Sequence, residues 1–368
     1  MSQLANDTGA INLSQGFPSF DPPQGLTDRV AHHLLSGANQ YAPMAGVPAL
    51  RAAIAEKTER LQHRKIDIEH EITVCCGATE GLFSTVQALV RAGDEVIVFD
   101  PAYDSYEPAV TLAGGKTRHV SLVIENNGFD FAIDWELLAD TVNSKTRLII
   151  LNFPHNPTGA ILRRADLDRL AEIVRNTGCY LLSDEVYEHI IFDNEPHCSL
   201  LSHDELWERT LVVSSFGKTF HTTGWKIGYC IAPPYLSDEF RKVHQFNTFA
   251  ISTPMQHAIA DFLASDPDFY EQLPAFYQAK RDFFCGLLKD SRFRLQPARS
   301  TFFQILDYAE ISAANDLELA KLWTQELGVA SIPLTVFCEH PFTGTRLRFC
   351  FAKDDATLEA AAEKLTSL

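Results

Sequence analysis

From residue 71 onward, short apolar runs rich in β-branched residues alternate with longer segments of helical periodicity, and this alternation limits the possible folds most strongly. Between two of the runs, Leu167, Leu170, Ala171 and Val174 follow helical spacing. Such alternation predicts βαβ units and a mainly parallel sheet, and strands this apolar predict helices on both faces. The strand candidates are 72–75, 95–99, 148–152, 180–183, 211–214 and 227–231.

The pattern changes near residue 266, where long helical stretches are followed by isolated strand candidates at 302–306, 329–332 and 347–351. The chain closes with Leu358, Ala361, Ala362 and Leu365 at helical spacing. We therefore expect an α/β protein with a large domain and a smaller α+β domain. The expected divisions are an N-terminal segment joining the small domain, the large domain and the small domain, at 1–36, 37–265 and 266–368.

The composition argues against several classes of protein. A formal net charge of -17 disfavours binding to nucleic acid or to anionic lipid. No apolar run reaches the roughly 18 residues that span a bilayer, and residues 1–7 do not resemble a signal peptide. The 8 cysteines form no C-x-x-C pair, which indicates reduced thiols. We expect a cytoplasmic protein without nucleic-acid or membrane partners.

Three familiar motifs are absent or incomplete. Gly217-Lys218-Thr219 resembles the end of a P-loop, but Val212 stands where that motif needs glycine. No G-x-G-x-x-G follows a strand, which removes the usual nicotinamide fingerprint. His189 and His197 lie near Asp184 and Glu185, yet without H-E-x-x-H spacing we expect solvated surface residues and no metal.

Lys218 lies in a turn rich in serine, glycine and threonine, directly after the strand candidate at 211–214. A lysine held in such a turn can be desolvated, which lowers its pKa toward the free amine that forms an imine. Ser215 and Lys226 supply a hydroxyl and a second cation suited to a phosphate. An ordinary loop lysine is the alternative.

Two further segments end strands of the same sheet. Asn156-Pro157-Thr158-Gly159 follows the run at 148–152, and Asp184 ends the run at 180–183, with Tyr187 three residues later. The carboxyl ends of parallel strands form one rim, where open α/β sheets present binding residues. A simple turn and an edge carboxylate are the alternatives, although a pyridinium nitrogen is a cation that such an aspartate can pair with.

These strings carry a resemblance to a known family. Together with Tyr41-Ala42-Pro43-Met44-Ala45-Gly46, Gly77-Ala78-Thr79-Glu80-Gly81 and Arg348-Phe349-Cys350-Phe351, they resemble the fold-type I, class I pyridoxal-phosphate aminotransferases. The chain is most similar to the kynurenine aminotransferase / glutamine transaminase K branch, and within it to bacterial methionine aminotransferase. The resemblance implies a large domain with a mostly parallel mixed sheet between helices, plus a smaller α+β domain.

The resemblance also implies a role for individual residues at the cofactor ring. Lys218 would form the imine with pyridoxal 5'-phosphate (PLP) and move the substrate's Cα proton. Asp184 would pair with the ring nitrogen, and Tyr187 and Asn156 would bind the ring oxygen. Tyr103 would stack on the ring.

The phosphate would bind between a strand and a helix. Ala78 and Thr79 precede a helical pattern, whose N-terminal N–H groups attract an anion, and Ser215 and Lys226 would complete this site. In the family, Tyr41 reaches the phosphate from the second subunit of a homodimer.

The substrate carboxylate would lie against Arg348, assisted by Asn156 and the backbone of Gly16, with Phe17 beside it. A structural salt bridge is the alternative for Arg348. We also expect a cis peptide bond before Pro157, with Pro101 as a second candidate.

The expected activity is transfer of an amino group from an apolar or aromatic L-amino acid, methionine-like, to a 2-oxo acid by a ping-pong mechanism. Two alternatives stay open. A PLP-dependent cysteine-S-conjugate β-lyase would use the same lysine and electron sink. A ligand-sensing regulator would need a DNA-binding module, which the net charge of -17 disfavours.

Overall fold

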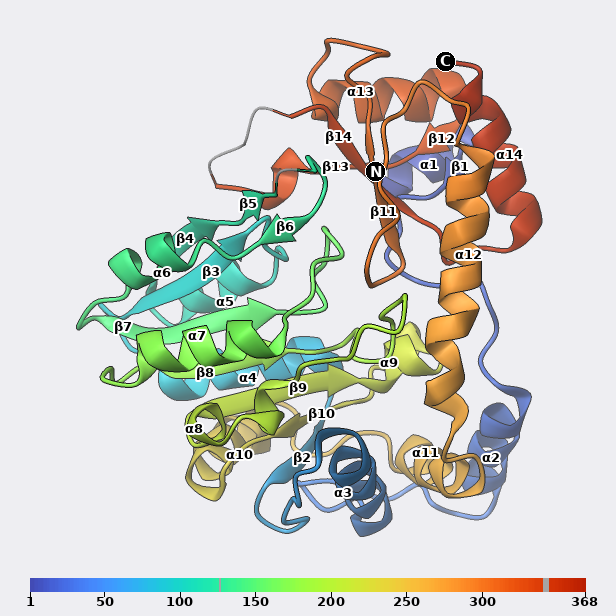
Figure 1. Ribbon diagram of the computed structural model, residues 1–368. Coiled ribbons are helices and arrows are strands. Elements are labelled where there is room, and N and C mark those ends of the chain that lie inside the picture. Colours follow the sequence, from blue (N-terminus) through green and yellow to red (C-terminus); the bar gives the residue numbers. More distant parts are fainter. Residues whose placement is uncertain (126, 340–343) are drawn as a thin grey trace.

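The computed structural model describes residues 1–125, 127–339 and 344–368. Its centre is a seven-stranded sheet in the order β2-β10-β9-β8-β7-β3-β4 (Figure 1). All neighbouring pairs are parallel except those of β10, which runs antiparallel to both β2 and β9. The strands are β2 (Ile72–Cys75), β3 (Glu95–Asp100), β4 (Lys116–Ser121), β7 (Thr146–Asn152), β8 (Tyr180–Asp184), β9 (Thr210–Ser215) and β10 (Gly228–Ile231).

Helices cover both faces of this sheet, because alternate strand residues are apolar on both sides. On β7, Ile149 and Leu151 pack in one buried cluster with α7, whereas Leu148 and Ile150 pack in another with α4 and α10. The helices around the sheet are α3 (Pro48–Gln62), α4 (Gly77–Leu89), α5 (Tyr106–Leu112), α6 (Trp135–Thr141), α7 (Arg164–Val174), α8 (Asp204–Trp207), α9 (Phe216–Thr219) and α10 (Pro234–Asn247).

A smaller group of elements lies beside one end of the sheet (Figure 1). It contains the antiparallel sheet β11-β14-β13, and it joins distant parts of the chain because β1 pairs in parallel with β12. The strands are β1 (Ile11–Asn12), β11 (Phe303–Asp307), β12 (Val329–Ala330), β13 (Ile332–Pro333) and β14 (Arg346–Cys350). The helices are α1 (Ser2–Thr8), α13 (Asp316–Leu322) and α14 (Asp355–Thr366).

Three helices connect this group with the central sheet. α2 (Gln24–Leu35) packs against α11 (Thr253–Ser265), and the long α12 (Leu273–Leu287) runs from there toward the smaller group (Figure 1). Residues 9–23 also pass between the two groups, so that Gly16 comes near the carboxyl-end rim of the large sheet.

The other expected strands and helices are present within one or two residues, and helices do cover both faces of the sheet, but the single strand expected at 329–332 is wrong. The chain forms two short strands there, β12 and β13, which belong to different sheets. β4 and the hairpin of β5 (Val123–Ile124) with β6 (Phe131–Ala132) were not expected. β4 is an edge strand whose side chains alternate between exposed and half-buried, except for the buried Val120, and it therefore lacks an apolar run.

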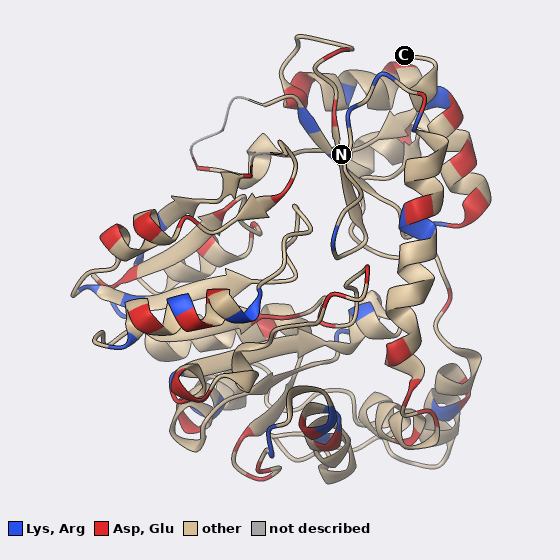
Figure 2. Cartoon of the chain, viewed as in Figure 1, with Lys and Arg blue, Asp and Glu red and all other residues tan. Residues whose placement is uncertain are grey.

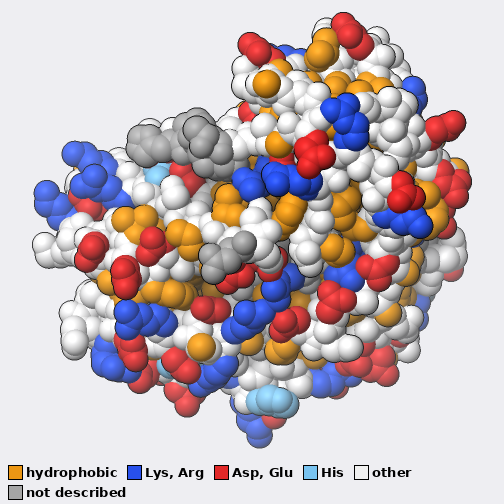
Figure 3. Space-filling view, turned by 45° about the horizontal axis from the view of Figure 1, so that its top comes forward, with side chains coloured by type: hydrophobic (Ala, Val, Ile, Leu, Met, Phe, Trp, Pro, Cys, Tyr) orange, Lys and Arg blue, Asp and Glu red, His pale blue; other side chains and the backbone are white. Residues whose placement is uncertain are grey.

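Charged side chains lie mainly on the outer elements. Figure 2 shows both signs of charge on α7 and α14, whereas the central strands carry few charges. On the face in Figure 3, acidic and basic side chains are interspersed with small apolar areas. None of the helices in the described part of the chain combines the length and apolar character needed to cross a bilayer.

Candidate active site

The carboxyl ends of β7, β8 and β9 meet at one rim of the large sheet. These strands are parallel, so Asn152, Asp184 and Ser215 at their ends lie on the same side. A cavity of about 200 Å³ opens there. It is lined by nine of the residues predicted to bind the cofactor, namely Ala78, Thr79, Tyr103, Asn156, Asp184, Tyr187, Ser215, Lys218 and Lys226.

The amine of Lys218 reaches this cavity from the one-turn helix α9. Its Nζ donates a hydrogen bond to the carbonyl oxygen of Gly16 at 2.9 Å and lies 5.5 Å from the ring centre of Tyr187. Burial lowers the pKa of Lys218 to about 8, although the carboxylate of Asp184 acts in the opposite direction. Roughly a tenth of the amine is therefore uncharged at pH 7, so the nucleophilic form is present at neutral pH.

Asp184 ends β8 and is buried. One oxygen of its carboxylate accepts a hydrogen bond from the hydroxyl of Tyr106 at 2.8 Å, and the other accepts from the backbone N–H of Val186 at 3.4 Å. Burial raises the pKa of Asp184 to about 6. Within the described residues it forms no ion pair, so its charge is available to a cation of a bound molecule.

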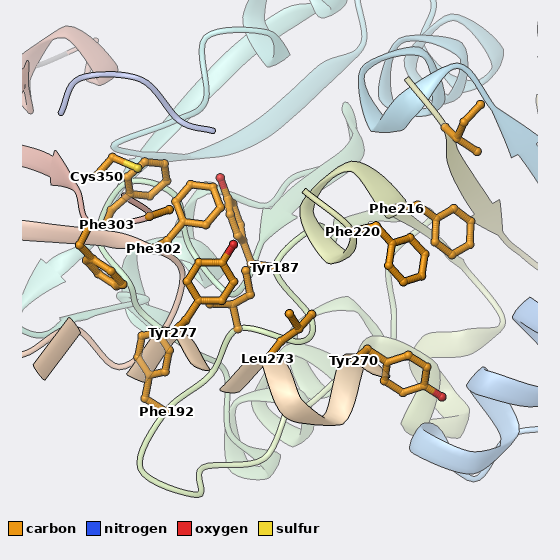
Figure 4. Packing of buried hydrophobic residues seen from close by; sticks show 14 of the residues in the cluster. Tyr187, Phe192, Phe216, Phe220, Tyr270, Leu273, Tyr277, Phe302, Phe303 and Cys350 are labelled. Atoms are coloured by element: carbon orange, nitrogen blue, oxygen red, sulfur yellow. The ribbon is translucent and has the colours of Figure 1, made fainter. Parts of the chain in front are cut away.

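Tyr187 lies on the turn after β8, against two phenylalanine rings at the start of β11. Figure 4 shows the rings of Tyr187, Phe302 and Phe303 close together. The Tyr187 ring meets Phe302 edge-on with 5.2 Å between centroids, and its centroid lies 6.0 Å from that of Phe303. Burial raises the pKa of the Tyr187 hydroxyl, so it remains a hydrogen-bond donor at physiological pH. Asn152 supports the same rim, because its side chain donates to the carbonyl oxygen of Asp184 at 3.1 Å.

The other end of the cavity is built around the N-terminus of α4. Gly77 begins this helix with φ +65°, a conformation that favours glycine. Lys226 donates to the hydroxyl of Thr79 at 3.3 Å, and the Ser215 hydroxyl accepts from the N–H of Gly217 at 3.1 Å. A helix N-terminus, two hydroxyls and a cation together form a site suited to a phosphate dianion.

Close contact between three segments explains why this end of the cavity holds its shape. A Cβ on Gly228 would lie 2.7 Å from the carbonyl oxygen of Ser214 and 2.8 Å from the carbonyl carbon of Gly77. Only glycine therefore lets β10 approach β9 and the start of α4 this closely.

Arg348 approaches the cavity from β14. Its guanidinium donates to the side-chain oxygen of Asn156 at 2.6 Å and to the carbonyl oxygen of Ser14 at 3.1 Å, and it stacks on Phe303 at 4.0 Å. Its Nε has no hydrogen-bond partner, and it forms no ion pair with an acidic side chain of the described residues. The alternative of a structural salt bridge is therefore wrong for Arg348 in the described part of the chain.

The remaining predicted residues lie around or away from the cavity. Gly16 accepts the hydrogen bond of Lys218, and Phe17 is 43% exposed with Lys353 5.0 Å above its ring. Tyr41 is not brought to this cavity within the chain, because it is 83% exposed and packs edge-on against Phe249.

Three peptide bonds near the rim are cis. They precede Pro101, Pro154 and Pro157, so the expectation for Pro157 and Pro101 is confirmed, and Pro154 is an addition. Sequence reasoning also missed Tyr106 and Asn152, which contact Asp184.

The expectation that His189 and His197 are solvated was wrong. His189 is 8% exposed and stacks on Tyr270 at 4.6 Å, and the His197 ring lies 2.8 Å from a carboxylate oxygen of Glu185. Burial lowers the pKa of His189 to about 3, so this ring is neutral. Both belong to a polar cluster behind the turn that carries Asp184 and Tyr187.

The residues around the cavity fit pyridoxal phosphate. Lys218, whose pKa is lowered, provides an amine for the cofactor's aldehyde. The buried Asp184 provides a negative charge for the ring nitrogen of the cofactor. The start of α4, with Thr79, Ser215 and Lys226, provides the donors for its phosphate.

Comparisons with known proteins agree with this geometry. The family model for class I and II aminotransferases matches residues 8–365. A methionine aminotransferase of Escherichia coli (strain K12) is 50% identical over 100% of this chain and 94% of its own length. A solved E. coli structure, whose study reports a methionine aminotransferase function, has a TM-score of 0.97 and covers 100% of this chain and 96% of its own.

Human kynurenine–oxoglutarate transaminase 1 is 33% identical over 99% of this chain and 93% of its own length. The solved N-succinyldiaminopimelate aminotransferase of Mycobacterium tuberculosis is 36% identical with a TM-score of 0.96, over 100% of this chain and 95% of its own. The predicted resemblance and the fold-type I fold are thus confirmed. The chain belongs to the class I and II aminotransferases, and it is a PLP-dependent enzyme that acts on amino acids and 2-oxo acids.

Proposed function

We propose that Lys218, Asp184 and Arg348 each perform a separate step or contact in transamination. When bound, PLP supplies an electron-withdrawing ring that stabilises negative charge at the substrate's Cα. Lys218 holds the cofactor and moves the Cα proton, and Asp184 keeps the ring nitrogen protonated. The pKa of about 8 for Lys218 supports this role, because the same amine must both release and accept a proton.

Around these residues, the other predicted contacts hold the cofactor in place. Tyr187 and Asn156 donate to the ring oxygen, and Tyr103 stacks on the ring. Ala78, Thr79, Ser215 and Lys226 bind the phosphate. The single cavity that all of them line supports these roles.

Arg348 binds the substrate's α-carboxylate, and its environment is the observation that best supports the proposed function. A buried guanidinium without an acidic partner in the described residues is costly, and a substrate carboxylate offsets that cost. Asn156 holds the guanidinium in place at 2.6 Å, and the ring centre of Phe303 lies 4.0 Å from it. Gly16, whose carbonyl oxygen accepts the hydrogen bond of Lys218, and Phe17 complete the substrate contacts.

The preferred amino donor is an apolar or aromatic L-amino acid, and methionine is the best candidate. The E. coli relative at 50% identity is a methionine aminotransferase. A dicarboxylate substrate needs a further buried cation for its distal carboxylate. Two arginines of the N-terminal part of the chain bind other groups: Arg29 binds Ser265, and Arg51 binds Glu69.

The protein further acts as a cytoplasmic homodimer with a composite site. The exposure of Tyr41 supports this, because the family role of Tyr41 requires it to reach the phosphate of a second subunit. We also propose the domain division at 1–36, 37–265 and 266–368, which the pairing of β1 with β12 supports for the N-terminal segment.

A panel of donors tests the substrate preference. We expect kcat/KM with a common 2-oxo acid acceptor to be highest for methionine and phenylalanine, intermediate for glutamine and lowest for aspartate. Apolar neighbours should differ little, because one methylene changes binding by roughly 1–3 kcal/mol. Aspartate as the best donor would overturn the preference and leave the aminotransferase assignment intact.

A further inference from the structure

Behind the turn that carries Asp184 and Tyr187 lies a buried polar cluster that the proposed reaction does not use. Its centre is one carboxylate oxygen of Glu188, the residue after Tyr187. Three donors meet at this oxygen: Nζ of Lys57 at 2.7 Å, the hydroxyl of Ser214 at 2.6 Å and the hydroxyl of Tyr229 at 2.7 Å. The side chains of Glu188 and Lys57 are only 11% and 5% exposed.

The donors come from the segments that deliver the cofactor ligands. Ser214 precedes Ser215 on β9, and Tyr229 follows Gly228 on β10. Ser214 and Tyr229 are direct partners across these strands, and so are Ser215 and Gly228. Because successive residues of a strand face opposite sides, one pair faces Glu188 while the next faces the phosphate end of the cavity.

The fourth segment in the cluster is α3, which supplies Lys57. Its Nζ also donates to the Tyr229 hydroxyl at 2.6 Å and lies 3.4 Å from Nε2 of His189. Burial disfavours the charge on Glu188, but Lys57 and the hydrogen bonds outweigh it, so the pKa of Glu188 lies well below its usual range. His189 stays neutral. Lys57 and Glu188 form an ion pair in a site with little solvent.

Backbone contacts extend the same connection. The N–H of Glu185 donates to the carbonyl oxygen of Val213 on β9 at 2.8 Å. The N–H of Glu188 donates to the carbonyl oxygen of Glu185 at 2.9 Å. The turn from Asp184 to Glu188 is thus joined to β9 by its backbone at one end and by the Glu188 carboxylate at the other.

We propose that Glu188 is a positioning residue of the aminotransferase site. Its carboxylate fixes the turn bearing Asp184 and Tyr187 to β9, which bears Ser215 and leads into the helix α9 that carries Lys218. The inference rests on the proposed roles of these four residues. Without the carboxylate, Tyr187 shifts relative to the ring oxygen that it binds, and the bound cofactor's spectrum reports the shift. A purely structural role would lower stability and leave the spectrum unchanged.

Glu188→Gln and Glu188→Ala test this, with Glu69→Gln as the matched control. Glu69 also pairs with a buried cation of α3, Arg51 at 3.1 Å, but lies before β2 and away from the turn. The measurements are thermal unfolding of the cofactor-free protein, PLP affinity by equilibrium dialysis, and the pH midpoint of the absorbance of bound PLP.

We expect Glu188→Ala to weaken PLP binding about ten- to hundredfold, the range for lost hydrogen bonds to a charged group, and to move the pH midpoint. Glu188→Gln keeps an acceptor and should show a smaller change in both. If the alanine variant does not fold, the glutamine variant decides the question alone. Glu69→Gln should change only the unfolding temperature.

Two results would count against the inference in different ways. A wild-type protein that binds no PLP would overturn the proposed function and this inference with it. A wild-type protein that binds PLP, with Glu188 variants that match Glu69→Gln in affinity and pH midpoint, would overturn the inference alone.

Discussion

The amine of Lys218 is partly uncharged near neutral pH because burial lowers its pKa to about 8. Lys218→Ala removes both the covalent contact to PLP and the group that moves the Cα proton. We expect turnover to fall about a thousandfold or more, and the pH-dependent absorbance of protein-bound PLP to disappear. Steady-state kinetics and a pH titration of the absorbance measure both effects. Normal turnover in the variant would show that another residue is the nucleophile.

The role of Asp184 can also be tested by substituting this single residue. Its interaction with the ring nitrogen is strongest as negative charge develops on the substrate, so Asp184→Asn should reduce kcat far more than PLP affinity. Asp184→Glu should be milder. Equal activity of the wild type and the Asn variant would identify Asp184 as a structural acid.

The raised pKa of Asp184 also predicts a pH dependence in the cofactor-free protein. The folded state holds this proton up to about pH 6, whereas the unfolded chain releases it near pH 4, so Asp184 destabilises the fold as pH rises through this window. Relative to Asp184→Asn, the wild type should lose on the order of 2 to 3 kcal/mol between about pH 4 and 6. Urea unfolding across this range measures the difference, and parallel curves for the two proteins would contradict it.

Individual residues differ in how far the sequence reveals them. Asp184 ends an apolar strand, and Lys218 and Asn156 lie a few residues after such strands. Because these strands belong to one parallel sheet, they bring the three residues to one rim. Tyr106 has no such signal, because it lies in α5 and reaches Asp184 across 78 residues of sequence. His189 and His197 were placed wrongly because polar residues near a strand end do not reveal that partners such as Glu185 are buried with them.

At the scale of elements, the site depends on how closely β10 approaches β9 and α4. Gly228→Ala would place its Cβ 2.7 Å from the Ser214 carbonyl oxygen, so these elements must separate. We expect a lower unfolding temperature and weaker PLP binding. Gly224→Ala is the control, because a Cβ at Gly224 meets nothing within 4 Å. Equal PLP affinity in the two variants would mean that this close contact does not shape the phosphate site.

The sequence reveals the strands of the sheet centre better than the edges. β3, β7, β8 and β9 are buried on both faces and therefore appear as continuous apolar runs. β4 and the two-residue strand β1 lack that pattern, and the pairing of β1 with β12 joins residues 11–12 to residues 329–330, which no local pattern predicts.

For the whole molecule, the proposed composite site gives a complementation experiment. Lys218→Ala and Tyr41→Phe chains are each expected to have little activity as homodimers. A hybrid dimer contains one site with both Lys218 and Tyr41 intact, so mixing should restore up to about a quarter of wild-type activity. Mass spectrometry verifies subunit exchange. No gain after exchange, or a monomer in solution, would contradict the composite site.

The central claim, that this chain is an aminotransferase for methionine-like donors, is tested most directly by a half-reaction. PLP-loaded protein is mixed with methionine and no acceptor, and the absorbance of bound cofactor and the released products are followed. We expect bound PLP to become pyridoxamine phosphate with one 2-oxo acid released per site, and a second 2-oxo acid to reverse the change. Release of ammonia in place of pyridoxamine phosphate formation, or no change in the cofactor at all, would contradict the account.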